Sequence, residues 1–118
     1  CVNAATQWAG IAALTGPQDT VDAMVKAFDE RRQLIVGRLN ALPGVSCVTP
    51  LGAFYAFPNI AGTGRSAAEL QNAMLNEAGV ATVAGTSFGA LGEGYVRFSY
   101  AASTAQIDEA MTRIAKIL

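Results

Sequence analysis

One apolar stripe spans residues 18–42, and a glycine–proline pair stands at each end of this segment. Apolar side chains recur along it at helical spacing, at Val21, Met24, Val25, Phe28, Ile35, Leu39 and Leu42. Gly16-Pro17 precedes the stripe and Pro43-Gly44 follows it, as is typical of helix boundaries. The pattern predicts one long amphipathic helix over residues 17–42.

The rest of the chain has the patterns of short strands and capped helices. Residues 5–14 predict a first helix, and two capping boxes, Ser66-Ala67-Ala68-Glu69 and Ser103-Thr104-Ala105-Gln106, open two more. Strand patterns occupy residues 45–48, 53–57, 80–84 and 95–100, and the first two strands form a hairpin. The residues that should face the core from the last two helices are Leu70, Ala73, Met74, Leu75, Ile107, Ala110, Met111, Ile114 and Ile117 or Leu118.

This order of elements predicts an α+β fold. We expect a small, mostly antiparallel sheet of about four strands, covered on one face by helices and preceded by the long connecting helix. Apolar residues make up 52% of the chain and charged residues 14%, against roughly 25% charged in typical soluble domains. The apolar surplus indicates a sizeable contact surface for another domain or subunit. The uncharged helix at residues 5–14, with Trp8 and Ile11, should be buried on most sides.

Several classes of function are excluded by composition. The formal charge of −1 gives no basic field for nucleic acid or an anionic membrane, and no apolar run approaches the ~20 residues of a membrane span. The chain has no histidine, which excludes a Ser-His or Cys-His nucleophile within it. Cys1 and Cys47 are too few for a zinc site, so no metal is expected. Because residue 1 is cysteine rather than methionine, we expect a piece of a longer chain.

Arg97 lies in the apolar strand pattern of residues 95–100, directly after the glycine-rich segment 85–94. Alternation places Val96 and Phe98 on one face of this strand and Arg97 on the other. A guanidinium is always charged and costly to desolvate, and no acidic residue lies within three positions of it. Two interpretations remain open: an exposed arginine on a solvated sheet face, or an arginine that binds a carboxylate or phosphate.

The neighbouring aromatic residues and the glycine-rich segment have structural interpretations. Phe54, Tyr55 and Phe57 are interpreted as hairpin and core aromatics, although their alternation leaves one of them facing a cleft or a partner. The glycine-rich segment lacks the order of a dinucleotide motif and the lysine of a nucleoside-triphosphate loop. It also runs into a strand rather than a helix, which favours a connecting loop that passes close to something bulky.

Three motifs in register resemble the C-terminal region of class I and II aminotransferases, the pyridoxal-phosphate enzymes of the aspartate aminotransferase type. They are Gly-Ala-Phe-Tyr-Ala-Phe-Pro at 52–58, the segment 79–89 that ends in Gly-Thr-Ser-Phe-Gly, and Gly-Glu-Gly-Tyr-Val-Arg-Phe-Ser-Tyr-Ala at 92–101. Residues 3–14 resemble the part of the family that follows the cofactor-lysine region. One departure is Ala84, where many relatives have proline.

The resemblance implies specific roles. Arg97 corresponds to the arginine that binds the substrate α-carboxylate, Phe54 should lie beside it, and Asn3 should lie near the active site at a dimer interface. The full-length enzyme should use pyridoxal 5′-phosphate, with the Schiff-base lysine upstream of residue 1. Lys26 and Lys116 are in the wrong context to replace that lysine. We expect no cofactor bound to this chain alone, and no transamination by it.

The resemblance also implies an organisation and partners. Residues 1–16 would belong to the large domain, 17–42 would be the connecting helix and 43–118 the small domain. The substrates would be an amino acid of aspartate, glutamate or aromatic type and a 2-oxo acid, in a cytoplasmic homodimer with a role in amino-acid biosynthesis. The alternative is a freestanding module that binds an amino acid or dimerises without catalysis.

Overall fold

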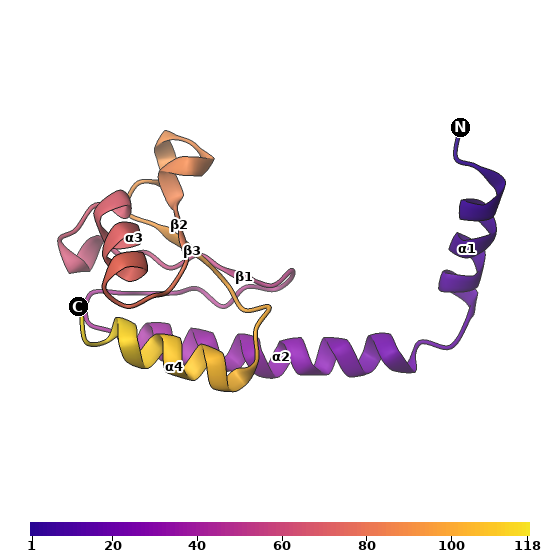
Figure 1. Cartoon of the computed structure of the whole chain (residues 1–118), viewed down its shortest axis with the longest axis horizontal. Coiled ribbons are helices and arrows are strands. Elements are labelled where there is room, and N and C mark those ends of the chain that lie inside the picture. The colour runs from indigo at the N-terminus through magenta and orange to yellow at the C-terminus, as the bar shows by residue number, and fades with distance from the viewer.

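Helix α2 (Asp19–Asn40) is the longest element of the computed structural model, which describes residues 1–118. Its bounds lie inside the predicted segment 17–42, and helix α1 (Ala4–Thr15) precedes it. The later elements are β1 (Tyr55–Ala56), α3 (Ala67–Asn76), β2 (Val83–Ala84), β3 (Val96–Ser99) and α4 (Thr104–Ile114), with 3₁₀ turns at Ala61–Thr63, Gly85–Phe88 and Ala90–Gly92. Figure 1 shows α4 lying alongside the C-terminal half of α2, below the strands.

The three strands form one antiparallel sheet in the order β1-β3-β2. Tyr55 pairs with Ser99 across β1 and β3, and Val83 pairs with Arg97 across β2 and β3. One face of the sheet is buried and consists of Ala56, Ala84, Val96 and Phe98. The other face carries Tyr55, Val83, Arg97 and Ser99, none of which is fully buried. The alternation predicted for β3 is therefore confirmed.

The buried face of the sheet packs against three helices in one hydrophobic core. The helices contribute Ile35, Leu39, Leu70, Met74, Ile107, Met111 and Ile114 to this core. An ion pair between Arg38 of α2 and Asp108 of α4 lies at the edge of the contact between these two helices. Helices thus cover one face of a small antiparallel sheet, and the predicted α+β class is confirmed.

The predicted hairpin between residues 45–48 and 53–57 is wrong, and the sheet has three strands rather than four. Only a single bridge, between Ser46 and Asn59, remains of the first strand. The Asn40 side chain at the end of α2 binds the backbone of the next residue, Cys47. Its amide oxygen accepts from the backbone N–H of Cys47 at 2.8 Å, and its amide nitrogen donates to the Cys47 carbonyl at 3.0 Å. Ser46 makes both of its backbone bonds to Asn59, which lies beyond the predicted second strand at residues 53–57.

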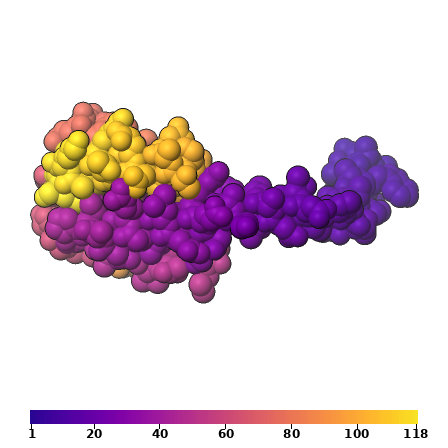
Figure 2. Space-filling view, turned by 90° about the horizontal axis from the view of Figure 1, so that it is seen from below, coloured from indigo at the N-terminus to yellow at the C-terminus, as the bar shows by residue number.

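Helix α1 and the N-terminal half of α2 extend away from the rest of the molecule, as Figures 1 and 2 show. The radius of gyration of 17.6 Å accordingly exceeds the roughly 13 Å of a compact domain near this length. No residue of α1 is buried, which differs from the expectation for residues 5–14, because no other element of the chain reaches this helix. None of the helices combines the length and apolar content that a bilayer span requires.

Many of the exposed apolar residues lie on this extended part. Its large exposed apolar side chains are Trp8, Ile11, Leu14, Val21, Met24 and Val25, which we call the α1–α2 apolar surface. The two halves of the apolar stripe on α2 therefore differ in burial. Ile35 and Leu39 are buried in the core, whereas Met24 and Val25 are more than half exposed. Exposed apolar surface of this extent is typical of a contact with another domain or subunit.

Both predicted capping boxes are present and fix the starts of α3 and α4. At α3, the Ser66 hydroxyl accepts from the Glu69 backbone N–H at 3.3 Å, and the Glu69 carboxylate accepts from the Ser66 N–H at 2.9 Å. Leu70, Ala73 and Met74 are buried as expected, but Leu75 is 51% exposed. Leu75 lies one residue beyond the buried pair Ala73 and Met74, on the side of the helix that no element covers.

The α3 capping box should make stability depend on pH. Hydrogen bonds from the backbone N–H and the hydroxyl of Ser66 hold the pKa of Glu69 below its ordinary value of 4.5. The unfolded chain therefore binds the proton more readily, so this contribution is present above pH 4.5 and is lost as the pH falls through the lower folded pKa. We expect Glu69→Ala to lower the urea midpoint at about pH 7 and to have a smaller effect at about pH 3. Glu69→Gln is the control, since it keeps an acceptor oxygen without a titrating group. An equal effect of Glu69→Ala at both pH values would contradict this role.

Candidate functional site

Arg97 is half-buried on the open face of the sheet, at the centre of β3. Its strand is held on both sides, by β1 and by β2, so its backbone position is fixed by the sheet ladder. The three ion pairs of the chain join Asp29 to Arg32, Asp108 to Arg38 and Glu109 to Arg113. Arg97 takes part in none of them, so the chain itself provides no carboxylate for this guanidinium.

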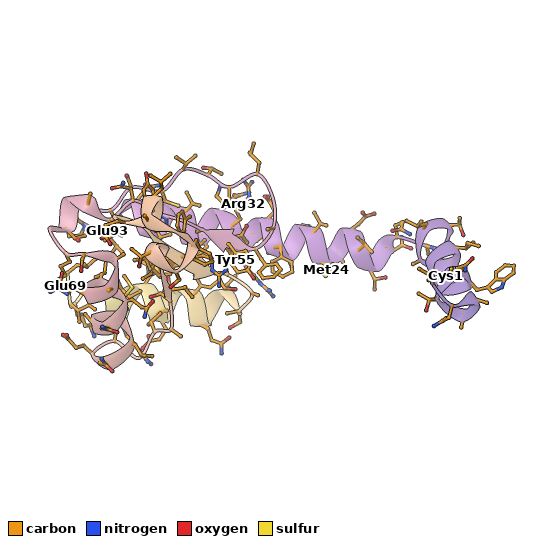
Figure 3. All side chains as sticks on the ribbon, turned by 90° about the horizontal axis from the view of Figure 1, so that it is seen from above. Cys1, Met24, Arg32, Tyr55, Glu69 and Glu93 are labelled. Carbon is orange, nitrogen blue, oxygen red and sulfur yellow. The ribbon has the colours of Figure 1, made fainter.

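Two aromatic rings contact the Arg97 guanidinium. Its central carbon lies 4.5 Å from the centre of the Tyr55 ring and 4.8 Å from the centre of the Phe88 ring. Tyr55 comes from β1 and is a diagonal neighbour of Arg97 on the same face, because it pairs with Ser99. Phe88 comes from the 3₁₀ turn that follows β2. Figure 3 shows Tyr55 beside the place where α2 leaves the rest of the molecule.

Phe54, which the resemblance puts beside Arg97, lies one ring further away. Its ring centre is 4.5 Å from that of Tyr55 and 5.9 Å from that of Phe28 on α2. The assignment of Phe54, Tyr55 and Phe57 to the core is wrong, since their exposed fractions are 39%, 36% and 41%. Tyr55 and Phe57 alternate onto the open face of the sheet, which no helix covers, whereas Phe54 lines an open groove beside α2. Asn3 lies at the start of α1, where its side chain accepts from the Thr6 backbone N–H at 2.9 Å.

A groove of about 650 Å³ lies between α2 and the turn at residues 51–54. Its walls are mostly apolar and include Met24, Val25, Phe28, Leu51, Phe54 and Tyr100. Asp29 and Arg32 form its polar part, and Arg32 also donates to the Pro50 carbonyl at 3.1 Å. Hydrogen bonds from Arg32 and Gln33 lower the pKa of Asp29, so this carboxylate stays charged at neutral pH.

The turn beside the groove has an unusual backbone. Ala53 has a φ of 57°, in the left-handed region that non-glycine residues rarely adopt. The Tyr100 hydroxyl donates to the Ala53 carbonyl at 3.0 Å, and the Tyr100 N–H donates to the Phe54 carbonyl at 2.9 Å. Burial raises the pKa of Tyr100, so its hydroxyl keeps the proton for this bond. These two bonds hold the turn, and with it Phe54 and Tyr55, against the end of β3.

The glycine-rich segment passes close to itself, whereas its sequence predicts a close approach to something bulky. A Cβ on Gly85 would overlap the carbonyl group of Gly92, and a Cβ on Gly92 would overlap that of Gly85. The segment also anchors α3, because the Glu93 carboxylate accepts from the backbone N–H groups of Ala67 at 2.9 Å and Gly94 at 3.1 Å. No local pattern indicates this role for Glu93, since its partner Ala67 lies 26 positions away.

Both lysines are exposed, Lys26 on α2 and Lys116 after α4, and neither lines the groove. The chemistry that this arrangement can perform is recognition of an anion by Arg97, with aromatic side chains around it.

Comparison with known proteins gives the family. The model of the aminotransferase class I and II family matches residues 1–114. An aspartate aminotransferase of Pyrococcus horikoshii is 47% identical over 114 residues, which are 95% of this chain and 29% of that protein. The solved structure of an alanine aminotransferase from Pyrococcus furiosus superposes with a TM-score of 0.90 at 40% identity, covering 98% of this chain and 30% of that one. An aromatic aminotransferase of Pyrococcus horikoshii superposes with a TM-score of 0.80 at 46% identity, covering 84% of this chain and 26% of that one.

The chain therefore belongs to the class I and II aminotransferases. The predicted family is confirmed, and the α+β arrangement agrees with the solved relatives. The chain spans about 30% of the length of the relatives that it matches.

The close approach of Gly85 and Gly92 can be tested by substitution. We expect Gly85→Ala to destabilise the chain by at least about 2 kcal/mol, because the added methyl group meets backbone that cannot move aside. Gly37→Ala on α2 is the matched control. It adds a methyl group with nothing within 4 Å and should stabilise the helix by about 0.5–1 kcal/mol. Urea unfolding of both variants measures the difference, and a Gly85→Ala variant as stable as wild type would contradict the packing of this loop.

Proposed function

We propose that Arg97 binds the α-carboxylate of the substrate in a full-length aminotransferase. The observation that carries this proposal is a half-buried guanidinium, in the centre of a sheet strand, without an acidic partner anywhere in the chain. The substrates of aminotransferases carry a suitable anion, since amino acids and 2-oxo acids both have a carboxylate next to the reacting carbon. The position of Arg97 in the motif at 92–101 supports the same role.

The chemistry of this contact is positional. A guanidinium presents paired N–H donors in a fixed plane, and a carboxylate can accept two of them at once. Two charge-assisted bonds fix both the place and the rotation of the carboxylate, so the adjacent carbon is presented in one orientation. Positioning of this kind accounts for a large part of enzymatic rate enhancement. Arg97 takes no part in proton transfer, because a guanidinium stays charged throughout.

We propose three parts for the chain within the whole enzyme. Residues 1–16 belong to the large domain, 17–42 form the connecting helix, and 43–118 form the small domain. The absence of any buried residue in α1 supports the first assignment, together with the α1–α2 apolar surface. Phe54 remains a predicted substrate neighbour, linked to Arg97 through Tyr55 rather than by direct contact of its own ring.

We propose that pyridoxal 5′-phosphate serves the full-length enzyme and is held by residues outside this chain. The exposure of Lys26 and Lys116 supports this, as does the length of the relatives. The substrates would be an amino acid of aspartate, glutamate or aromatic type and a 2-oxo acid, and relatives named as aspartate and aromatic aminotransferases support that range. The homodimer, the cytoplasmic location and the biosynthetic role stay predictions.

A module without catalysis is the second candidate function. The α1–α2 apolar surface favours it, because an unaccompanied chain would cover that surface by dimerising. Such a module would bind an amino acid with the residues of this chain alone. The two candidates differ in what the isolated chain does.

Substitution of Arg97 tests the proposed role. In the full-length enzyme, Arg97→Ala should lower kcat/KM by at least about 100-fold, or roughly 2.7 kcal/mol, because the carboxylate loses both charge-assisted bonds. Arg31→Ala is the matched control. Arg31 also lies over an aromatic ring, that of Phe28 at 5.2 Å, but on α2, and its loss should change kcat/KM by less than about threefold. A loss of kcat/KM no larger for Arg97→Ala than for Arg31→Ala would refute the role.

Calorimetry of the isolated chain separates the two candidate functions. We expect no binding of aspartate, an aromatic amino acid or pyridoxal 5′-phosphate below about 1 mM, since one arginine supplies too few contacts for tighter binding. No transamination should be detectable after addition of the cofactor. Micromolar binding of an amino acid would instead favour the freestanding module.

A further inference from the structure

The Arg97 side chain lies on the open face of the sheet and forms no ion pair within the chain. An arginine side chain has many rotamers, and a strand fixes only its Cα–Cβ direction. The chain offers this guanidinium no carboxylate. What it offers are the rings of Tyr55 and Phe88, at 4.5 Å and 4.8 Å from the central guanidinium carbon. Both distances are within the range of favourable cation–π contacts.

Both rings that contact Arg97 are exposed. Tyr55 is 36% and Phe88 55% exposed, so neither is held by the hydrophobic core. Cation–π contact uses the face of an aromatic ring and leaves the N–H donors of the guanidinium free to bind an anion. The two rings therefore restrict Arg97 without occupying the atoms that would bind a carboxylate.

Each ring is supported from behind by further aromatic contacts. The Tyr55 ring centre lies 4.5 Å from that of Phe54, which in turn lies 5.9 Å from that of Phe28 on α2. On the other side, the Phe88 ring meets Phe57 edge to face at 6.1 Å. A continuous series of rings thus runs from helix α2 to Arg97 and on to the loop after β2.

Further contacts fix the second ring. Phe57 stacks on Tyr95 at 5.2 Å with the ring planes 10° apart. Phe88 ends the 3₁₀ turn that begins at Gly85, and the backbone of Gly85 packs closely against Gly92 and donates to the Tyr95 carbonyl at 2.8 Å. The position of Phe88 is therefore set by the sheet rather than left to a free loop.

We propose that Tyr55 and Phe88 are positioning residues for substrate recognition: their rings hold the Arg97 guanidinium in the orientation that binds the substrate α-carboxylate. The proposal rests on the proposed function of Arg97 and deepens it. Tyr55 acts through its ring, which is the part that contacts Arg97.

The test is a double-mutant cycle in the full-length holoenzyme, with KM and kcat for the amino acid as readouts. Tyr55→Leu and Phe88→Leu should each raise KM about fivefold to thirtyfold, with a smaller change in kcat. The ring-for-ring variants Tyr55→Phe and Phe88→Tyr should restore KM to within about twofold of wild type. In an Arg97→Lys background, whose ammonium lacks the paired planar donors, the same leucine changes should alter KM by less than about twofold.

The outcomes are distinguishable. Equal effects of the leucine changes in the wild-type and Arg97→Lys backgrounds would mean a general structural role and overturn the proposal. A wild-type KM in both leucine variants, with Arg97→Lys impaired, would overturn the positioning role and leave the function of Arg97 standing. A wild-type KM in Arg97→Lys itself would overturn both. If a leucine variant precipitates, Tyr55→Met and Phe88→Met replace it under the same expectations.

Discussion

Burial of Val96 and Phe98 is the constraint on which the rest of the structure depends. Their side chains pack into the core that α2, α3 and α4 form, and side chains alternate along a strand. A shift of one residue in β3 would expose both and bury the charge of Arg97. The hydrophobic core therefore decides that Arg97 lies on the open face, and the candidate site is a consequence of packing on the opposite side of the same strand.

Local patterns in the sequence were sufficient for the helices and for the faces of β3. Each of these features depends on residues that are close together in the chain: the apolar stripe along α2, the capping boxes at Ser66 and Ser103, and the alternation around Arg97. The failures concern partners further apart in sequence. The hairpin was wrong because residues 45–48 pair only through the bridge from Ser46 to Asn59, beyond the predicted second strand. The role of Glu93 was missed because it bonds to Ala67.

The environment of Arg97 was beyond sequence reasoning for the same reason. Tyr55 reaches the guanidinium only because β1 pairs with β3, and Phe88 reaches it only through the turn that Gly85 and Gly92 shape. Alternation alone could have put Tyr55 on the face opposite Phe54, but not beside Arg97. The family resemblance identified the anion that Arg97 would bind, the substrate carboxylate. The structure identified the two rings that contact the Arg97 guanidinium.

The most direct measurement of the central claim is a crystal structure of the full-length enzyme with an unreactive carboxylate analogue of the substrate. We predict that both oxygens of one carboxylate lie at about 2.7–2.9 Å from Arg97 nitrogens, in one plane with the guanidinium. Tyr55 and Phe88 should keep their present distances of 4.5 Å and 4.8 Å from its central carbon. A carboxylate bound by another cation, with Arg97 turned toward solvent, would contradict the account.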